Sequence, residues 1–127
     1  GLESSTYAID NSIKQVKDKI KLSDYRKLNF EDNFFDLVVA IGPVYTLNLG
    51  DAISLLKEIQ RVTKGSSFIT LGAYESEEDF WLFRDWTLLG TTVLQRVEWV
   101  EVLKHVGYTG DYKFNSSQSL NLIRKPG

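Results

Sequence analysis

One largely apolar run, which opens on Phe-Asp, restricts the possible folds of this chain more than any other feature. It covers residues 34–41 and stops at Gly42-Pro43. Runs without polar alternation are typical of central strands in parallel sheets, which are buried on both faces. The irregular stretch that follows, residues 42–47, places a loop at the carboxyl end of the strand, where open α/β sheets bind ligands. The alternative is a buried strand with no site at its end. The neighbouring segments decide between these two interpretations.

The composition limits the partners and the chemistry. The 127 residues suit a single domain with one core, and a net charge of −2 gives no electrostatic attraction for nucleic acid or an anionic membrane. No apolar run approaches the roughly 18 residues of a membrane span, and no signal peptide is apparent, so a soluble, cytoplasmic protein is expected. The sequence has no cysteine and one histidine, so no metal site is expected.

The segments before the apolar run predict a helix followed by a strand. The chain begins with the pattern of a strand end, and a helix is expected over residues 5–17, with Ser4, Ser5 or Thr6 as its N-cap. Residues 20–24 alternate with period two and predict a short strand. The apolar residues on one face of the predicted helix and just beyond it are Ile9, Ile13, Val16 and Ile20.

The segments after the apolar run continue the alternation. A helix that ends at Lys64-Gly65 is expected, and a strand follows at residues 66–73. Strands that alternate with helices in this way favour βαβ crossovers and a parallel sheet. The apolar stripe of this helix consists of Ala52, Leu55, Leu56, Ile59 and Val62.

The last third of the chain departs from this order. Residues 75–89 predict an aromatic-rich helix with acidic residues in its first turn, which suits the helix dipole. A second helix is expected at residues 97–106 and ends at Gly107. Residues 108–114 and 120–124 predict two strands, and their short connection makes the pair antiparallel.

In this order, the elements resemble the class I S-adenosylmethionine-dependent methyltransferases over nearly the whole chain. Glu3 ends the first strand, Asp24 ends the second, and Phe35-Asp36 opens the run that is similar to the family's fourth strand. Residues 56–66 resemble its passage from helix through glycine to strand, and residues 99–108 resemble its last helix leading into a hairpin. The resemblance implies a Rossmann-like α/β sheet, mostly parallel, with a C-terminal antiparallel hairpin.

The resemblance also implies a site for S-adenosylmethionine. A carboxylate at a strand end can accept hydrogen bonds from both ribose hydroxyls, which suits Glu3, while Asp24 would accept from the adenine amino group, with Tyr25 beside the ring. The alternative is that Glu3 and Asp24 are solvated acids. The residues expected at the cofactor are Leu2, Glu3, Ser4, Asp24, Tyr25, Ala40, Ile41 and Gly42.

The methyl acceptor is expected to be a small molecule or a protein, and the charge balance disfavours a nucleic acid. Tyr45 would face the acceptor, and Trp81, Arg84 and Trp86 are candidates to line its pocket. Packing in the core or a subunit contact is the alternative role for this aromatic segment. No catalytic residue is assigned, because methyl transfer is an in-line displacement that depends largely on positioning.

One part of the family pattern is missing. The family's first strand and glycine-rich cofactor loop precede the first acidic residue, whereas only Gly1 and Leu2 precede Glu3 here. That strand lies between the strand ending at Glu3 and the strand at residues 34–41, so its absence leaves a gap of about 9.6 Å in the sheet. Buried strand edges are rarely left unpaired.

Three arrangements would resolve the gap. An N-terminal segment absent from this chain supplies the strand, a second chain donates it (as in a homo-oligomer), or the sheet closes up with altered pairing. The first is favoured, so residues 1–127 are expected to form a single, N-terminally incomplete domain that binds cofactor and transfers methyl groups poorly alone. The alternative function is a catalytically inactive methyltransferase-like module for interaction or oligomerisation.

Overall fold

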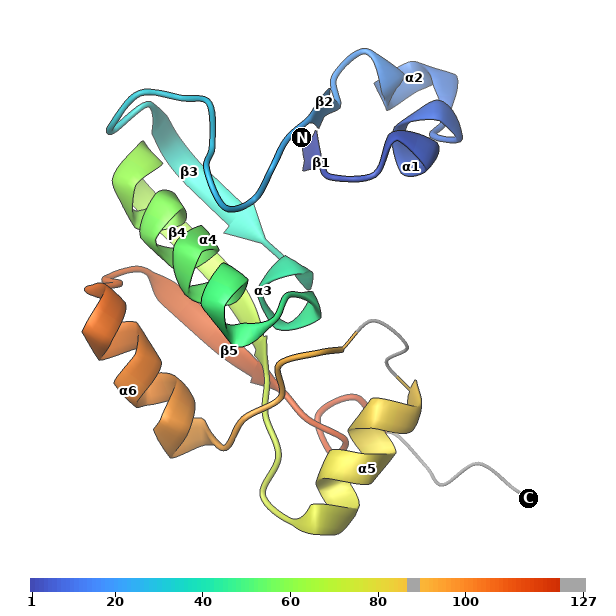
Figure 1. Ribbon diagram of the computed structural model, residues 1–127, viewed down its shortest axis with the longest axis vertical. Coiled ribbons are helices and arrows are strands. Elements are labelled where there is room, and N and C mark those ends of the chain that lie inside the picture. Colours follow the sequence, from blue (N-terminus) through green and yellow to red (C-terminus); the bar gives the residue numbers. More distant parts are fainter. Residues whose placement is uncertain (87–89, 122–127) are drawn as a thin grey trace.

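In the part of the chain that the structure describes, the strands lie in two separate sheets, and every pairing within them is parallel (Figure 1). The computed structural model describes residues 1–86 and 90–121. Its strands are β1 (Leu2–Glu3), β2 (Lys21–Leu22), β3 (Phe35–Ala40), β4 (Thr63–Gly72) and β5 (Asp111–Asn115). The smaller sheet pairs β1 with β2, and the larger has the order β3-β4-β5. The predicted α/β fold is confirmed, whereas closure of the sheet by direct pairing of β1 with β3 is not observed among the described residues.

Six helices are present in the described part of the chain. They are α1 (Thr6–Asp10), α2 (Lys14–Lys17), α3 (Pro43–Thr46), α4 (Leu49–Val62), α5 (Glu77–Trp86) and α6 (Arg96–Val106). Within residues 1–86 and 90–121, no helix is long and apolar enough to cross a membrane.

The single helix predicted over residues 5–17 is wrong, because the chain breaks between α1 and α2. Ser5 is the N-cap, and its hydroxyl accepts a hydrogen bond from Ala8 N at 3.2 Å. The Asn11 amide donates to Tyr7 O at 2.9 Å, and Ser12 Oγ donates to Ile9 O at 2.6 Å. Such local side-chain bonds to backbone compete with helix continuation. Two residues of the expected apolar face, Ile13 and Val16, are consequently exposed.

Helix α4 supplies most of the core. All five residues of its predicted apolar stripe are buried, and Asn48 caps its start by accepting a hydrogen bond from Asp51 N at 2.9 Å. The predicted stop at Lys64-Gly65 is wrong, since α4 passes directly into β4 and both residues lie in that strand. β4 contains one extra residue between its pairings with Phe35 and Leu37 of β3, which is a β-bulge beside Gly65.

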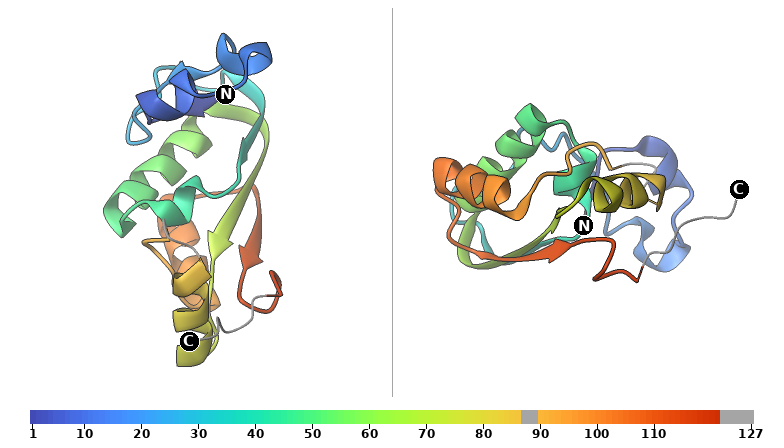
Figure 2. Two further views of the ribbon diagram at one scale, coloured as in Figure 1. Left: turned by 90° about the vertical axis from the view of Figure 1, so that its right-hand side faces the viewer. Right: turned by 90° about the horizontal axis from the view of Figure 1, so that it is seen from below.

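The larger sheet is covered on one face. Helices α4 and α6 lie on the same side of it (Figure 2), and the Trp99 indole of α6 donates a hydrogen bond to Gly72 O at 2.7 Å. On the opposite face of β3, Leu37 is 61% exposed, Val39 is 53% exposed and Ile41 is 69% exposed. The prediction that this strand is buried on both faces is therefore wrong here, because no described layer covers that face.

The C-terminal elements match the prediction in part. Helix α6 ends at Gly107, which has a φ of 75°, although Val97 of its predicted apolar face is exposed. Strand β5 runs parallel to β4. Residues 117–121 form a turn, so Leu120 does not begin the predicted second strand. The remainder of that strand lies outside the described residues, as do Leu88 and Leu89.

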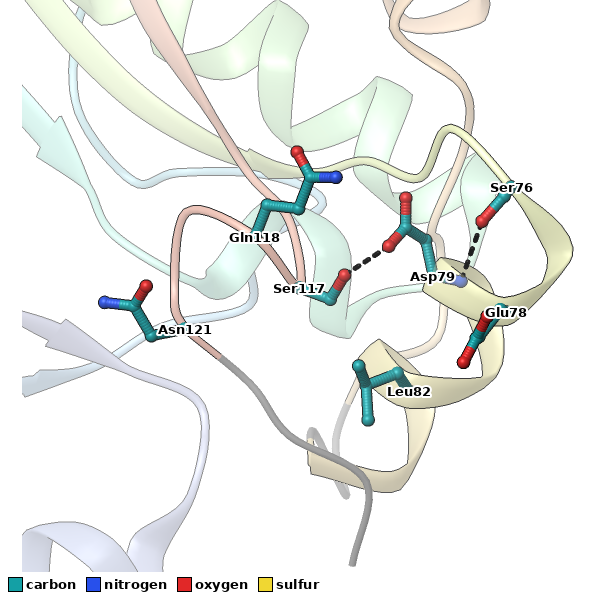
Figure 3. A pocket seen from close by; sticks show the side chains of 7 residues that line it. All are labelled: Ser76, Glu78, Asp79, Leu82, Ser117, Gln118 and Asn121. Atoms are coloured by element: carbon teal, nitrogen blue, oxygen red, sulfur yellow. Dashed lines mark hydrogen bonds between the residues drawn. The ribbon is translucent and has the colours of Figure 1, made fainter.

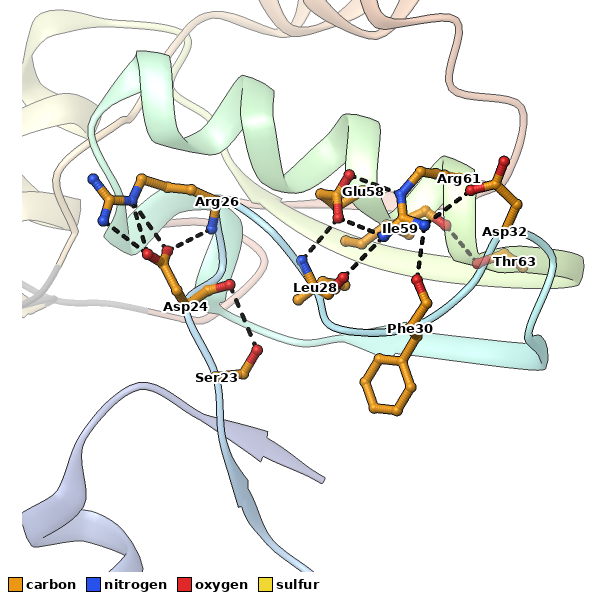
Figure 4. A network of polar contacts seen from close by, with 10 residues as sticks. All are labelled: Ser23, Asp24, Arg26, Leu28, Phe30, Asp32, Glu58, Ile59, Arg61 and Thr63. Atoms are coloured by element: carbon orange, nitrogen blue, oxygen red, sulfur yellow. Dashed lines mark hydrogen bonds and ion pairs between the residues drawn. The ribbon is translucent and has the colours of Figure 1, made fainter.

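A polar network ties the loop between the two sheets to α4 (Figure 4). Arg61 donates to Leu28 O at 2.9 Å, to Phe30 O at 2.8 Å and to Asp32 Oδ1 at 2.9 Å. Glu58 accepts from Arg61 Nη2 at 2.7 Å and from Leu28 N at 2.8 Å. These hydrogen bonds, foremost that from Arg61, lower the pKa of Glu58, and the same contact raises the pKa of Arg61. The network fixes the path from β2 to β3.

Replacement of Gly65 with alanine tests the β-bulge. A Cβ at Gly65 would overlap the Asp36 carbonyl oxygen, so Gly65→Ala is expected to lower the free energy of unfolding by about 1–3 kcal/mol. Gly50→Ala is the control, because a Cβ there makes only an ordinary contact of 3.5 Å and alanine favours a helix by about 0.5–1 kcal/mol. Urea unfolding followed by tryptophan fluorescence measures both. Equal stability of the two variants would contradict the bulge.

Candidate functional site

One large cavity, of about 990 Å³, lies between the two sheets. Residues of β1, β3 and the inward face of α4 line it, together with Lys21 of β2. Seven consecutive residues, 37–43, border this cavity, and the first four of them lie in β3. Successive residues of a strand point to opposite faces, so a cavity that touches all of them must run along the edge of β3. It therefore lies along the edge of β3 that is unpaired among the described residues, beside β1.

Seven of the eight predicted cofactor residues border this cavity. They are Leu2, Glu3, Ser4, Tyr25, Ala40, Ile41 and Gly42. They come from three separate stretches of the chain, and the structure brings them together around one space. Their binding of a cofactor stays a prediction.

Glu3 and Tyr25 form one contact of the site. Glu3 Oε2 accepts hydrogen bonds from Ser4 N at 3.2 Å and from the Tyr25 hydroxyl at 3.1 Å. Burial and the neighbouring Glu3 carboxylate raise the pKa of Tyr25, so its hydroxyl stays a donor. Among the contacts of the described residues, Glu3 Oε1 accepts no hydrogen bond. This oxygen has the chemistry to accept hydrogen bonds from a ribose.

Asp24 is the predicted residue that does not border the cavity. Its carboxylate pairs with Arg26, whose Nη2 lies 2.7 Å from Oδ2 and whose Nε lies 3.0 Å from Oδ1. The Arg26 backbone N–H also donates to Oδ1, at 2.9 Å. The hydrogen bonds from the Arg26 side chain lower the pKa of Asp24 to about 2. An adenine amino group would therefore compete with Arg26 for this exposed carboxylate.

The end of β3 is shaped by Gly42. This residue has a φ of 99° and forms the N-cap of α3. Its N–H donates to Thr70 Oγ1 of β4 at 2.9 Å, and Thr70 is buried. Sequence reasoning missed Thr70, because only the strand register places residue 70 beside residue 42.

The predicted acceptor residues are not brought together at the cavity. The Tyr45 ring packs edge-on against Phe83 of α5, with ring centroids 5.9 Å apart. Trp81, Arg84 and Trp86 are exposed on α5, and none of them borders the cavity. The Arg84 guanidinium lies over a neighbouring ring of the same helix, 5.7 Å from its centroid.

A second, more open cavity of about 670 Å³ lies between α5 and the turn at residues 117–121 (Figure 3). Asp79 accepts a hydrogen bond from the Ser117 hydroxyl, and its backbone N–H donates to Ser76 Oγ at 3.1 Å. These groups join the turn to the start of α5. In the described part of the chain, no group of three His, Cys, Asp or Glu residues is placed to hold a metal ion.

Comparison with known families gives one match. The model of a methyltransferase domain matches residues 1–71, which is more than half of the chain. This region contains β1, β2 and β3, α4, and most of β4. No curated protein matches the chain.

Three solved structures have a similar fold. The YcgJ protein of Bacillus subtilis has 15% identity and a TM-score of 0.66, and the match covers 84% of this chain and 50% of that chain. A second match is to the complex between the Haloferax volcanii Trm112 methyltransferase activator and a protein described as a methyltransferase. It has 21% identity and a TM-score of 0.63, and it covers 84% of this chain and 49% of that chain. A protein from Bacillus halodurans, likewise described as a methyltransferase, has 16% identity and a TM-score of 0.55. The match covers 73% of this chain and 52% of that chain. The chain thus spans about half the length of these structures.

Removal of Arg26 tests the Asp24 pairing. Arg26→Ala is expected to return the pKa of Asp24 from about 2 towards 3.8, because the hydrogen bonds that favour the carboxylate are lost. A depressed pKa means that the pair favours the folded state above about pH 4 and loses this effect as the pH falls towards 2. NMR titration of the Asp24 side-chain carbon measures the midpoint.

Arg96→Ala is the matched control, since Arg96 pairs with Glu75 at 3.4 Å instead. A midpoint of Asp24 that is the same in both variants and in the unmodified chain would contradict the assignment.

Proposed function

The chain belongs to the class I S-adenosylmethionine-dependent methyltransferase family, and from this premise we propose that it carries part of a site that methylates a small molecule or a protein. The observation that supports this most is the convergence of seven predicted cofactor residues, from three stretches of sequence, on one cavity. The comparisons support methyl transfer in general, since the family model is a methyltransferase domain.

The residues present fit the chemistry of the cofactor. S-adenosylmethionine, when bound, supplies the methyl group from its sulfonium. Glu3 Oε1 would accept hydrogen bonds from the ribose hydroxyls, while Tyr25 holds the other carboxylate oxygen. Ala40, Ile41 and Gly42 would lie along the methionine portion. The role of these residues is to bind and orient, which is the main requirement of an in-line transfer.

The acceptor would approach near Tyr45. A Cβ placed on Gly42 would lie 3.9 Å from the Tyr45 hydroxyl, so this hydroxyl lies close to the carboxyl end of β3. The contact of Tyr45 with Phe83 links this position to α5. Trp81, Arg84 and Trp86 remain candidates for a more distant part of an acceptor surface, because they lie exposed on the same helix.

We also propose that a further β-strand occupies the cavity along the edge of β3. In the described residues, β3 pairs only with β4 and β1 only with β2, so their facing edges carry unpaired backbone groups. The inward face of α4 offers Leu55, Ile59 and Val62 to apolar side chains of such a strand. The cofactor would lie at the carboxyl end of the new strand, between Glu3 and Gly42.

The strand is proposed to come from a longer natural polypeptide. A strand between β1 and β3 must have both edges free, yet each of the five described strands already pairs with a neighbour. A folded second copy would therefore lose one of its own pairings by donating a strand. This favours an N-terminally incomplete domain over a homo-oligomer. It also implies impaired methyl transfer by residues 1–127 alone.

Titration with S-adenosylhomocysteine tests the cofactor site. NMR titration, which registers even millimolar affinity, is expected to shift the amide signals of Glu3, Tyr25 and Gly42. Glu3→Gln is expected to weaken binding about 10- to 100-fold, because a hydrogen bond to a charged group contributes about 1.5–3 kcal/mol.

Glu101→Gln is the control, since Glu101 is an exposed acid on α6, outside the cavity. Equal affinity of the two variants would contradict the role of Glu3. The absence of amide shifts in the unmodified chain would contradict cofactor binding by this chain and favour the inactive interaction module.

The mass of the natural gene product tests the source of the strand. Intact-protein mass spectrometry is expected to give a mass above the 14.5 kDa of this chain. Fragmentation of the additional residues is expected to give an apolar segment and a glycine-rich turn before Gly1. A natural product of 14.5 kDa would contradict this proposal and leave donation by a second chain.

A further inference from the structure

We infer that Thr70 is a positioning residue for the cofactor end of the cavity. Its buried hydroxyl fixes the backbone of Gly42, and through it the rim of the cavity, although Thr70 itself does not border the cavity. The importance of this rim to ligand binding rests on the proposed function. The hydrogen bond and the backbone geometry are independent of the proposed function.

The position of Thr70 follows from the register of the two strands. Ala40 and Ile69 are the last paired residues of β3 and β4. Beyond this pair the chain leaves the ladder and turns into α3, so the Gly42 N–H finds its partner in a side chain. Thr70 is only 5% exposed, so water competes little for this hydrogen bond.

Gly42 is needed here for its conformation. Its φ of 99° is one that L side chains rarely adopt, whereas the space around it is open, because the nearest atom to a Cβ at this position would be the Tyr45 hydroxyl oxygen at 3.9 Å. Since the Gly42 N–H is already used by Thr70, Gly42 contributes shape to the site and does not donate this N–H to the ligand.

The other end of α3 is held independently. The Tyr45 carbonyl accepts hydrogen bonds from Thr91 N at 2.8 Å and Thr92 N at 3.0 Å, and Thr92 Oγ1 donates to Leu47 O at 2.5 Å. Loss of the Thr70 hydroxyl should therefore loosen the beginning of α3 and leave its end in place. This separation makes the effect of Thr70 local and measurable.

The test compares Thr70→Val, which keeps the shape of the side chain but removes the hydroxyl, with Thr70→Ser, which keeps the hydroxyl. Thr63→Val is the matched control, because Thr63 lies at the other end of β4, outside the cavity, and its Oγ1 donates to Ile59 O at 2.6 Å. Hydrogen exchange of the Gly42 amide, followed by NMR, is the first readout. The dissociation constant of S-adenosylhomocysteine is the second.

Thr70→Val is expected to speed exchange at Gly42 about 5- to 10-fold without changing exchange at Ala40, and to weaken ligand binding by about the same factor. Thr70→Ser and Thr63→Val should stay within about twofold of the unmodified chain in both readouts. Unchanged Gly42 exchange in Thr70→Val, or an equal loss in Thr63→Val, would overturn the inference.

The two proposals fail in different ways. One outcome is faster Gly42 exchange in Thr70→Val together with no binding of S-adenosylhomocysteine by the unmodified chain. This outcome would contradict the proposed function and support the positioning of the Gly42 backbone by Thr70. Faster exchange with undiminished ligand binding would overturn the positioning role and leave the proposed function standing.

Discussion

The pairing of β3 with β4 is the contact on which the rest of the structure depends. The bulge beside Gly65 takes up one extra residue, and from Leu37 onward the register is regular to the last pair, Ala40 and Ile69. A shift of one residue would turn every side chain of β4 to the opposite face. Ile69 and Leu71 would then leave the core beneath α4, and Gly42 would no longer meet Thr70. The register therefore determines both the core and the shape of the site.

The sequence predicts the elements that carry strong periodicity. The apolar stripe of α4 is a clear example, because its five residues are buried whatever lies on the far side of the sheet. The break between α1 and α2 was not predictable from spacing alone, since it depends on competing bonds from Asn11 and Ser12. Exposure of Leu37 and Val39 was not predictable either, because burial depends on a layer that the strand itself does not encode.

In the candidate site too, some residues could be predicted from the sequence and their contacts could not. Glu3 and Gly42 could be singled out because strand ends in α/β sheets gather at one edge. The partners of these residues could not, since Tyr25 contacts Glu3 from 22 residues further along the chain and Thr70 reaches Gly42 through strand register. The pairing of Asp24 with Arg26, two residues along the chain, reduces the capacity of the Asp24 carboxylate to accept hydrogen bonds from a ligand. Residue type suggests a role, whereas neighbours decide whether the group is available.

The exposed edge of β3 has a consequence for the behaviour of the chain in concentrated solution. An unpaired strand edge with apolar side chains is a template for pairing with other polypeptides and favours aggregation. Along residues 34–41, Asp36 is the sole charged side chain, and it is 87% exposed beside Lys64, whose Nζ lies 3.2 Å from its carboxylate. Asp36 thus supplies the only charge along this stretch, and a charged side chain on a strand opposes such pairing.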